Sequence, residues 1–386
     1  MLKVKTYNKI SVKGLDRFSR ESYEVGGDIA HPDAVMLRSQ NLHDEPLHEN
    51  VKAIARCGAG VNNIPLEQCS EKGIVVFNTP GANANAVKEL VLTGLLLSCR
   101  DIKGGMDFVG TLAGQTDIGK TCESEKKRFA GLELKGKTLG IIGLGAIGSM
   151  VADAALALGM NVAGYDPALS VDAAWRLSNQ VERKENIATL LGCCDFLTLH
   201  VPAIEATKGL INEDALSQIK KGAVVLNFAR EAIVDNEAMV KALEAGSVRS
   251  YVTDFPNELF MDRQDVLQIP HLGASTAEAE ENCAIMAADQ LMDFLVNGNI
   301  VNSVNFPALT LARGGTSRIT FSNENVSGVL GQVLSVLADH KVNVLDMSNK
   351  SRGEMAYNII DVDGEVDEGV VTAVESVDHV NAVRLI

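Results

Sequence analysis

Long apolar runs are missing from this sequence, and no segment is apolar over the length that a bilayer requires. The first residues mix charged and apolar side chains and lack the separate basic and apolar regions of a signal peptide. Low-complexity tracts and short-period repeats are also absent. These absences predict a globular protein with no membrane partner, for which a cytoplasmic location is the default expectation.

Positive charge is scarce as well. Lys and Arg number 35 against 50 Asp and Glu, which gives a formal net charge of −15. The densest basic cluster, Lys126–Arg128, follows Glu123 and Glu125 and is typical of a solvated helix face. Because an acidic chain repels nucleic acids and anionic lipids, we expect no nucleic-acid partner. An anionic substrate would need isolated arginines gathered in a cleft.

Metal-ligand spacings do not occur. The seven cysteines are odd in number and form no CxxC pair, and none of the seven histidines is spaced from a cysteine as a metal ligand would be. This pattern predicts reduced thiols that are mostly small core residues, and no metal site.

The length of 386 residues, with 46% hydrophobic and 22% charged residues, predicts a soluble protein of two or three domains. In the first hundred residues, predicted strands at 33–38, 52–57 and 73–78 alternate with helices, the longest at 84–100. Residues 101–130 form a connecting segment that includes a charged helix. From Leu134 a second α/β unit predicts a parallel, doubly wound sheet. Its expected strands are 138–143, 161–166, 195–201, 223–228, 250–254 and 266–270.

A long helix is predicted at 275–298, with Gly298 as its stop. It is either an ordinary terminal helix or the return of the chain to complete the first domain. Residues 299–315 are expected to end in a linker. The remaining residues follow the order strand, helix, strand, strand, helix, strand, which predicts a ferredoxin-like unit.

The most informative motif is Gly143-Leu-Gly145-Ala-Ile-Gly148, which follows a predicted strand and opens an Ala-rich helix. In this context the glycines favour a tight turn, close approach of a pyrophosphate to the helix N-terminus, and close helix packing. Asp166 ends the next strand, where a carboxylate binds the ribose hydroxyls and repels a 2′-phosphate. The motif therefore predicts binding of NAD rather than NADP.

Three kinds of side chain follow later strands of the same unit. Arg230 follows one strand, Asp254 and Glu258 follow the next, and His271 comes after one more. The carboxyl ends of parallel strands converge on one crevice, so these groups can meet there. A histidine can take a hydroxyl proton as hydride leaves, a carboxylate can orient the ring, and an arginine can clamp a substrate carboxylate.

A third candidate site lies in the first unit. Arg38 and Arg56 each end a strand, and Arg56 is followed by the small residues of Gly58–Val61. Exposed backbone N–H groups beside two arginines suit a carboxylate or a phosphate. The alternative is a simple glycine turn with surface arginines.

Together these segments resemble the D-isomer-specific 2-hydroxyacid dehydrogenase family. The resemblance covers roughly residues 30–305, and the final unit resembles an ACT domain. It is carried by blocks in family order: ARCGAGVNNI, NTPGANANAVKELV, LKGKTLGIIGLGAIG, LTLHVPA, LNFAREAIVDNEAMVKAL and IPHLGAST.

The resemblance implies three domains and a homodimer or homotetramer. It places a discontinuous, flavodoxin-like substrate-binding domain at 1–97 and 275–310, a Rossmann NAD-binding domain at 98–274, and an ACT-like regulatory domain at 316–386. Catalysis is implied for Arg230, Glu258 and His271. Contacts with NAD are implied for Gly143, Gly145, Ala146, Ile147, Gly148, Asp166, His200, Val201, Pro202, Phe228, Ala229, Arg230, Asp254, His271, Gly273 and Ala274. Substrate contacts are implied for Arg38, Arg56, Gly58, Ala59, Gly60 and Val61, and contacts with an amino-acid effector for Asn323 and Asn325.

With the ACT-like unit, the resemblance implies oxidation of a small phosphorylated 2-hydroxy acid in amino-acid biosynthesis. The alternatives are a hydroxypyruvate or glyoxylate reductase on the same scaffold and an NAD(H)-sensing, corepressor-like binding protein. Three departures from the family pattern stand out. Glu231 replaces a common glycine, Leu259 replaces a common proline after a shortened segment, and the sequence around Asn323 lacks the histidine and proline of serine-sensitive relatives.

Overall fold

The computed structural model describes the backbone of residues 1–386 and every side chain except that of Asp172. The chain forms two compact units: unit 1 combines Met1–Asn83 with Ala277–Ile386, and unit 2 is Ala84–Thr276. None of the described helices is both long and apolar enough to cross a membrane.

The N-terminal part of unit 1 is built on a parallel sheet with the strand order β2-β1-β3-β4-β5, which is the flavodoxin-like order expected from the sequence. The strands are β1 (Leu2–Thr6), β2 (Tyr23–Gly26), β3 (Ala34–Leu37), β4 (Ala53–Arg56) and β5 (Val75–Phe77), and the short helices are α1 (Val12–Leu15) and α2 (Leu66–Glu71). The predicted runs at 33–38, 52–57 and 73–78 are confirmed as β3, β4 and β5.

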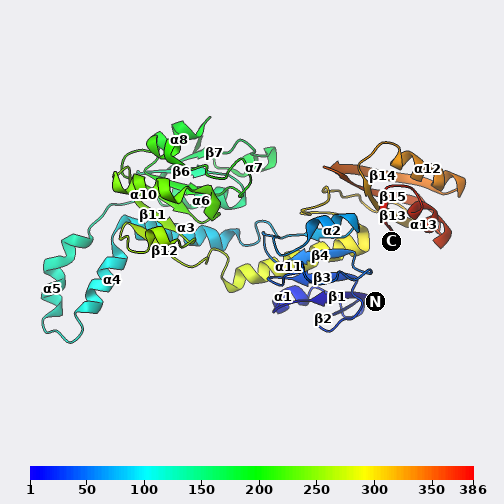
Figure 1. The fold of residues 1–386 in the computed structure, drawn as a ribbon, viewed down its shortest axis with the longest axis horizontal. Coiled ribbons are helices and arrows are strands. Elements are labelled where there is room, and N and C mark those ends of the chain that lie inside the picture. The colour runs from blue at the N-terminus through cyan, green and yellow to red at the C-terminus, as the bar shows by residue number, and fades with distance from the viewer. The chain divides into compact units, whose positions relative to one another are not determined.

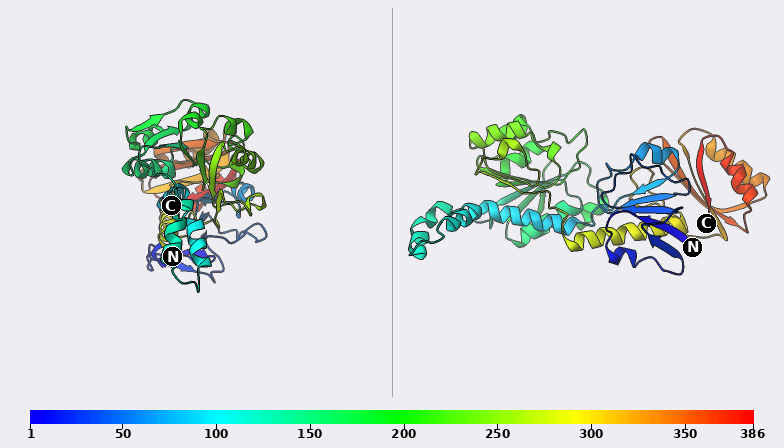
Figure 2. Two further views of the ribbon diagram at one scale, coloured as in Figure 1. Left: turned by 90° about the vertical axis from the view of Figure 1, so that its left-hand side faces the viewer. Right: turned by 60° about the horizontal axis from the view of Figure 1, so that its bottom comes forward.

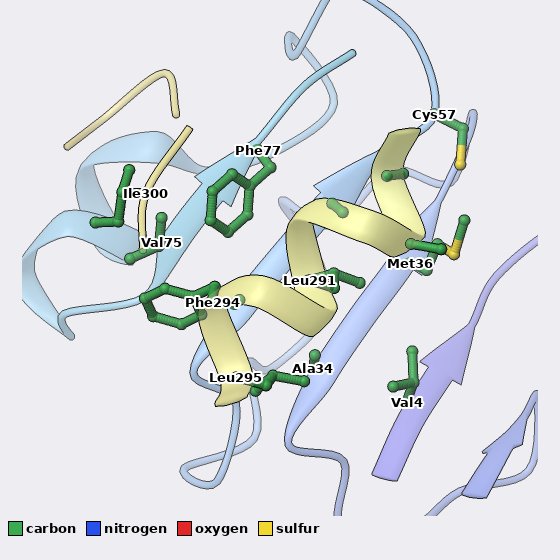
Figure 3. Packing of buried hydrophobic residues seen from close by; sticks show 14 of the residues in the cluster. Val4, Ala34, Met36, Cys57, Val75, Phe77, Leu291, Phe294, Leu295 and Ile300 are labelled. Carbon is green, nitrogen blue, oxygen red and sulfur yellow. The ribbon is translucent and has the colours of Figure 1, made fainter. Parts of the chain in front are cut away.

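The helix α11 (Ala277–Asn297) covers one face of this sheet. In Figure 3, Leu291 and Leu295 lie over strand residues that include Ala34 and Met36, and Phe294 lies beside Phe77. Figure 2 shows the same helix, in yellow, along the blue strands of unit 1. The chain thus returns to the N-terminal sheet after unit 2.

Unit 2 contains a seven-stranded parallel sheet with the order β12-β11-β10-β9-β6-β7-β8. This is the doubly wound Rossmann arrangement, so the predicted fold class is confirmed. The strands are β6 (Thr138–Ile142), β7 (Asn161–Tyr165), β8 (Val181–Arg183), β9 (Phe196–Leu199), β10 (Ala223–Asn227), β11 (Val248–Thr253) and β12 (Val266–Gln268). The helices are α3 (Ala84–Cys99), α4 (Ile102–Thr111), α5 (Ile118–Glu125), α6 (Ala146–Ala157), α7 (Val171–Arg176), α8 (Ile187–Cys193), α9 (Glu213–Ser217) and α10 (Asn236–Glu244).

The division between the units differs from the boundaries expected at residues 97 and 275. The helix α3 packs against α6 and β10 of unit 2, and a Cβ added at Gly94 in α3 would lie 3.0 Å from the ring of Phe228. The close packing explains why α3 belongs to the compact unit of the Rossmann sheet, although the sequence pattern placed most of it with the N-terminal domain.

The connecting segment after α3 forms two helices rather than one. In Figure 1, α4 and α5 extend away from the strands of unit 2 as an arm. Neither helix has a buried residue among those described, and Met106 and Val109 of α4 are 71% and 52% exposed.

The C-terminal part of unit 1 confirms the predicted ferredoxin-like unit. Its sheet is antiparallel with the order β14-β15-β13-β16, and α12 and α13 share one hydrophobic cluster with it. The elements are β13 (Ser317–Glu324), α12 (Val329–Asp339), β14 (Asn343–Arg352), β15 (Met355–Asp363), α13 (Glu368–Glu375) and β16 (Val380–Leu385).

Arginine side chains of the C-terminal unit donate hydrogen bonds to the carboxyl end of α11. The last four carbonyls of any α-helix have no partner within the helix. Here Arg384 donates to the carbonyls of Phe294 and Leu295, Arg313 to that of Val296, and Arg318 to that of Asn297. Tyr357 and Ile359 of β15 also belong to the hydrophobic core of the N-terminal sheet. The ferredoxin-like unit is therefore packed against that sheet and is not connected to it by a linker alone.

Candidate active site

The glycine motif forms a tight turn between β6 and α6. Gly143 has a φ of +91°, and a Cβ there would lie 2.5 Å from the carbonyl oxygen of His200. A Cβ at Gly148 would lie 2.0 Å from the carbonyl oxygen of Gly143. Both positions thus need glycine for the fold itself, one for backbone conformation and both for close packing.

Gly145 differs from its neighbours because a Cβ there would meet no atom within 4 Å. It is the N-cap of α6, with a negative φ of −69°, so neither space nor backbone strain in the protein explains a glycine. Ala146 and Ile147 follow as the first residues of α6, where unpaired N–H groups and the helix dipole favour an anion. The open space is where a pyrophosphate would approach the backbone.

Replacing Gly145 by alanine tests whether this glycine serves dinucleotide binding rather than the fold. We expect the thermal unfolding temperature to stay unchanged, while the KM for the dinucleotide rises about 10- to 100-fold through loss of charge-assisted hydrogen bonds. Steady-state kinetics and thermal unfolding of the same sample measure both quantities. The matched control is Gly148→Ala, which should lower the unfolding temperature because its Cβ has no room.

The carboxylate of Asp166 lies directly beside the glycine turn. Its Oδ2 accepts a hydrogen bond from the N–H of Leu144 at 2.8 Å, and its Oδ1 accepts one from the N–H of Ala168 at 2.9 Å. These bonds fix the acid next to the turn that would hold a pyrophosphate. The arrangement fits a dinucleotide whose adenosine ribose carries free hydroxyls.

His200, Val201 and Pro202 border the same turn from the end of β9. The ring Nε2 of His200 pairs with Thr198 Oγ1 at 3.0 Å, and burial lowers the pKa of His200 to about 3, so the ring is neutral at physiological pH. Phe228, another predicted cofactor contact, has its side chain in the core against Gly94. Only its backbone can face a cofactor.

The turn that carries Arg230 is shaped by a buried asparagine at the end of β10. Asn227 Nδ2 donates to the carbonyl of Arg230 at 2.9 Å, and its Oδ1 accepts the N–H of Ala229 at 3.2 Å. The Arg230 side chain is exposed, and its Nη1 donates to the carbonyl of Ala229 at 2.6 Å. The exposed guanidinium therefore lies just beyond the end of β10, and its catalytic role stays a prediction.

Asp254 and the loop of His271 meet at the ends of β11 and β12. Asp254 is fully buried, and its Oδ2 accepts the N–H of Gly273 at 3.2 Å. Burial raises the pKa of Asp254, and the nearby charge of His271 works in the opposite direction. Among the described residues, the buried Asp254 Oδ1 has no hydrogen-bond partner.

The ring of His271 contacts an aromatic side chain in a tilted arrangement. Its centroid is 5.0 Å from that of Phe255, with an interplanar angle of 59°. Glu258 begins a short 3-10 helix (Glu258–Phe260) and is exposed. Among the described residues no hydrogen bond or ion pair joins Glu258 to His271, so that pairing stays a prediction.

The segment before Glu258 is held by Asn257, which the sequence motifs did not single out. Its backbone N–H donates to Gln268 Oε1 at 2.7 Å, and its Nδ2 donates to Glu231 Oε1 at 3.5 Å. Glu231, which departs from the family pattern, thus bridges the turn after Arg230 and the segment that carries Glu258. Its position next to a predicted catalytic residue was the only sequence signal for this role.

In unit 1 the residues of the predicted anion site lie at the carboxyl ends of β3 and β4. Arg56 Nε donates to the carbonyl of Arg38 at 3.1 Å. Gly58 has a φ of +146°, and a Cβ there would lie 1.5 Å from Arg56 Nη1, so the guanidinium lies over the glycine loop. Asn78 Nδ2 holds the carbonyl of Ala59 at 2.7 Å. The structure brings Arg38, Arg56 and residues 58–61 together.

The loop after β3 also depends on Asn8, which the sequence gave no reason to select. Asn8 has a φ of +65°, and its Oδ1 accepts the N–H groups of Ser39 and Gln40 at 2.9 and 2.8 Å. This fixes the backbone on which Arg38 is presented.

The predicted effector residues are already engaged within the ACT-like sheet. Asn323 is buried, its Oδ1 accepts Asn358 Nδ2 at 2.8 Å, and its Nδ2 donates to the carbonyl of Glu324 at 2.6 Å. Asn325 Nδ2 donates to the carbonyl of Gly353 at 3.1 Å. An effector at Asn323 would have to displace these bonds.

Three of the seven cysteine thiols are deeply buried. Burial raises the pKa of Cys57, Cys69 and Cys194 to about 12, which disfavours thiolates. Across the residues that the structure describes, no group of three or more His, Cys, Asp or Glu side chains could hold a metal ion.

Comparison with known proteins relates both units to characterised families. Residues 98–274 match the family described as D-isomer specific 2-hydroxyacid dehydrogenase, NAD binding domain, and residues 317–379 match the ACT domain. The chain is 31% identical over 339 residues to the D-3-phosphoglycerate dehydrogenase of Haemophilus influenzae, which covers 85% of this chain and 79% of that protein.

Two further similarities come from a longer relative and a solved structure. The chain is 37% identical over 270 residues to the D-3-phosphoglycerate dehydrogenase of Rattus norvegicus, covering 68% of this chain and 48% of that protein. It thus spans about half the length of such relatives. The crystal structure of NAD⁺-bound 3-phosphoglycerate dehydrogenase in Entamoeba histolytica superposes with a TM-score of 0.61 at 27% identity, covering 80% of this chain and 99% of that one.

Proposed function

Because the chain belongs to the D-isomer-specific 2-hydroxyacid dehydrogenase family, we propose that it is an NAD-dependent D-3-phosphoglycerate dehydrogenase. It oxidises 3-phospho-D-glycerate to 3-phosphohydroxypyruvate, the first step of L-serine biosynthesis. The observation that carries this proposal is the open cradle at Gly145 with Asp166 beside it, on the sheet whose strand ends present Arg230 and His271.

The cradle around Gly145 would hold the pyrophosphate of NAD, and Asp166 would hold its ribose. Bound NAD would supply the acceptor for the hydride that leaves C2 of the substrate. The Nε2 or Nδ1 of His271 takes the hydroxyl proton, and Asp254 fixes the loop of His271 through Gly273. No metal is required for these steps.

The two anionic ends of the substrate are shared between arginines. Arg230 clamps the carboxylate next to the reacting carbon, and Glu258 stabilises the protonated form of His271. Arg38 and Arg56, over the loop 58–61, take the phosphate. We assign the phosphate to Arg38 and Arg56 because a second cationic site is needed only when the substrate carries a phosphate in addition to its carboxylate.

The test is an assay of NAD reduction by purified full-length protein. We expect 3-phospho-D-glycerate to be oxidised with a much higher kcat/KM than D-glycerate, and phosphohydroxypyruvate to be reduced with NADH. Activity on unphosphorylated acids alone would favour the hydroxypyruvate or glyoxylate reductase. Tight NADH binding without turnover of any 2-hydroxy acid would favour the corepressor-like protein.

Assembly and regulation complete the proposal. The exposed apolar residues of α4, such as Met106 and Val109, support packing of the arm against a second copy in a homodimer or homotetramer, which light scattering tests. A small amino acid is the proposed effector of the ACT-like unit. A cytoplasmic location accompanies this metabolic role.

A further inference from the structure

The guanidinium of Arg38 is paired with a carboxylate that the sequence motifs did not include. Arg38 Nη1 lies 2.7 Å from Glu280 Oε1, and the two side chains are 42% and 44% exposed. Arg38 directly follows β3, and Glu280 lies in the first turn of α11. The pair is therefore open enough for a ligand to reach the guanidinium without moving either element.

The second arginine of the anion site belongs to the same charge cluster. Arg56 donates to the carbonyl of Arg38 at 3.1 Å. Burial raises the pKa of the neighbouring Cys283, the charges of Arg56 and Arg38 lower it, and the charge of Glu280 raises it again. The charges of Arg38, Arg56 and Glu280 therefore all act on the Cys283 thiol, and the cluster contains one carboxylate and two guanidinium groups.

We propose that Glu280 is a specificity-determining residue that counterbalances Arg38 and limits the affinity of the site for the substrate phosphate. The inference rests on the proposed function, in which Arg38 and Arg56 take the phosphate. An exposed ion pair contributes little net stability because water screens it, so a phosphate can displace the carboxylate from Arg38. The displaced carboxylate stays on α11 and repels the phosphate dianion.

A purely structural role for Glu280 is the competing explanation. A carboxylate near the N-terminus of any helix is stabilised by the helix dipole. Glu278 shares the first turn of α11, and the described side chains include no ion pair to it. Glu278→Gln therefore removes the same charge from the same turn without affecting Arg38, and it is the matched control.

The kinetic test compares the two variants in the full-length enzyme. In Glu280→Gln we expect the KM for 3-phospho-D-glycerate to fall about three- to tenfold, the size of one screened charge interaction. The KM for D-glycerate should stay unchanged because that acid has no group for Arg38. Glu278→Gln should change neither value. A fall in KM for both acids, or in neither, would overturn the proposal.

A second readout needs no turnover. Inorganic phosphate should raise the thermal unfolding temperature of Glu280→Gln more than that of the wild type or of Glu278→Gln, since tighter binding to the folded state stabilises it. Equal shifts in all three proteins would refute the role of Glu280. If the wild type does not prefer the phosphorylated acid, the proposed function fails, but this comparison still decides the role of Glu280.

Discussion

Replacing His271 by asparagine lowers kcat by about 10²- to 10⁴-fold, the usual contribution of a positioned general base. Asparagine keeps a polar side chain in the loop but cannot take the hydroxyl proton. The loop itself should survive, because Asp254 holds it through the backbone N–H of Gly273 rather than through the histidine. The KM for NAD should therefore change little, and the steady-state rate of NADH formation at saturating substrate gives kcat.

Two controls define this result. His340→Asn changes an exposed histidine whose ring Nδ1 pairs with the carbonyl of Val336 at the end of α12, and it should keep full activity. Asp254→Asn keeps the shape of the acid but removes its charge, and it should lower kcat through the pose of His271. An active His271→Asn enzyme, within threefold of the wild type, would rule out His271 as the base.

The glycine motif could be predicted from the sequence because its requirements are local. Gly143, Gly145 and Gly148 lie within six residues of one another. Asp166 follows β7, the strand that pairs with β6, and it accepts the N–H of Leu144 within the glycine motif. The strand-end rule then brought Arg230 and His271 to the same edge of the sheet. Each of these arguments uses only the order of elements along the chain.

The elements missed by the sequence patterns are those with weak hydrophobic signals. β1 has lysines at positions 3 and 5 and is mostly half-buried, and β8 has no buried residue. The arm helix α4 contains Gly104, Gly105 and Gly110, which argue against a helix, but Asp101 caps it by accepting the N–H of Gly104 at 2.8 Å.

The long-range hydrogen bonds and ion pairs of individual side chains could not be predicted from the sequence. Glu280 meets Arg38, and the arginines of the C-terminal unit meet the end of α11, only because the chain returns to its first sheet. The hydrophobic periodicity of a helix such as α11 shows which of its faces is apolar. It does not show which residues elsewhere in the chain pair with its charged side chains or its terminal carbonyls. The linker expected at 299–315 was inferred from composition, which carries no information about the packed interface that follows it.

The largest effect on stability is expected at this interface, from Arg318→Met. Arg318 is fully buried and makes a bidentate pair with Asp361, with Nε–Oδ1 and Nη2–Oδ2 distances of 2.6 and 2.8 Å. Its Nη1 also donates to the carbonyls of Asn297 and Leu311. Methionine fills similar volume but leaves a buried carboxylate and helix carbonyls unpaired. We expect a loss of about 3–5 kcal/mol in the free energy of unfolding, measured by urea denaturation.

The pH dependence of that loss identifies its cause. The hydrogen bonds from Arg318 hold the pKa of Asp361 below its usual value, so the pair stabilises the folded state above the unfolded-state pKa of about 4. This contribution disappears as the pH falls through the lower, folded-state pKa. The difference in the free energy of unfolding between wild type and Arg318→Met should therefore narrow in acid.

Arg352→Met is the control, because it removes one exposed hydrogen bond to the carbonyl of Ser303. It should lower the free energy of unfolding by less than about 1.5 kcal/mol. The double variant Arg318→Met with Asp361→Leu should recover part of the loss, because no unpaired charge then remains buried. A pH-independent loss with no such recovery would show that Arg318 acts through packing alone.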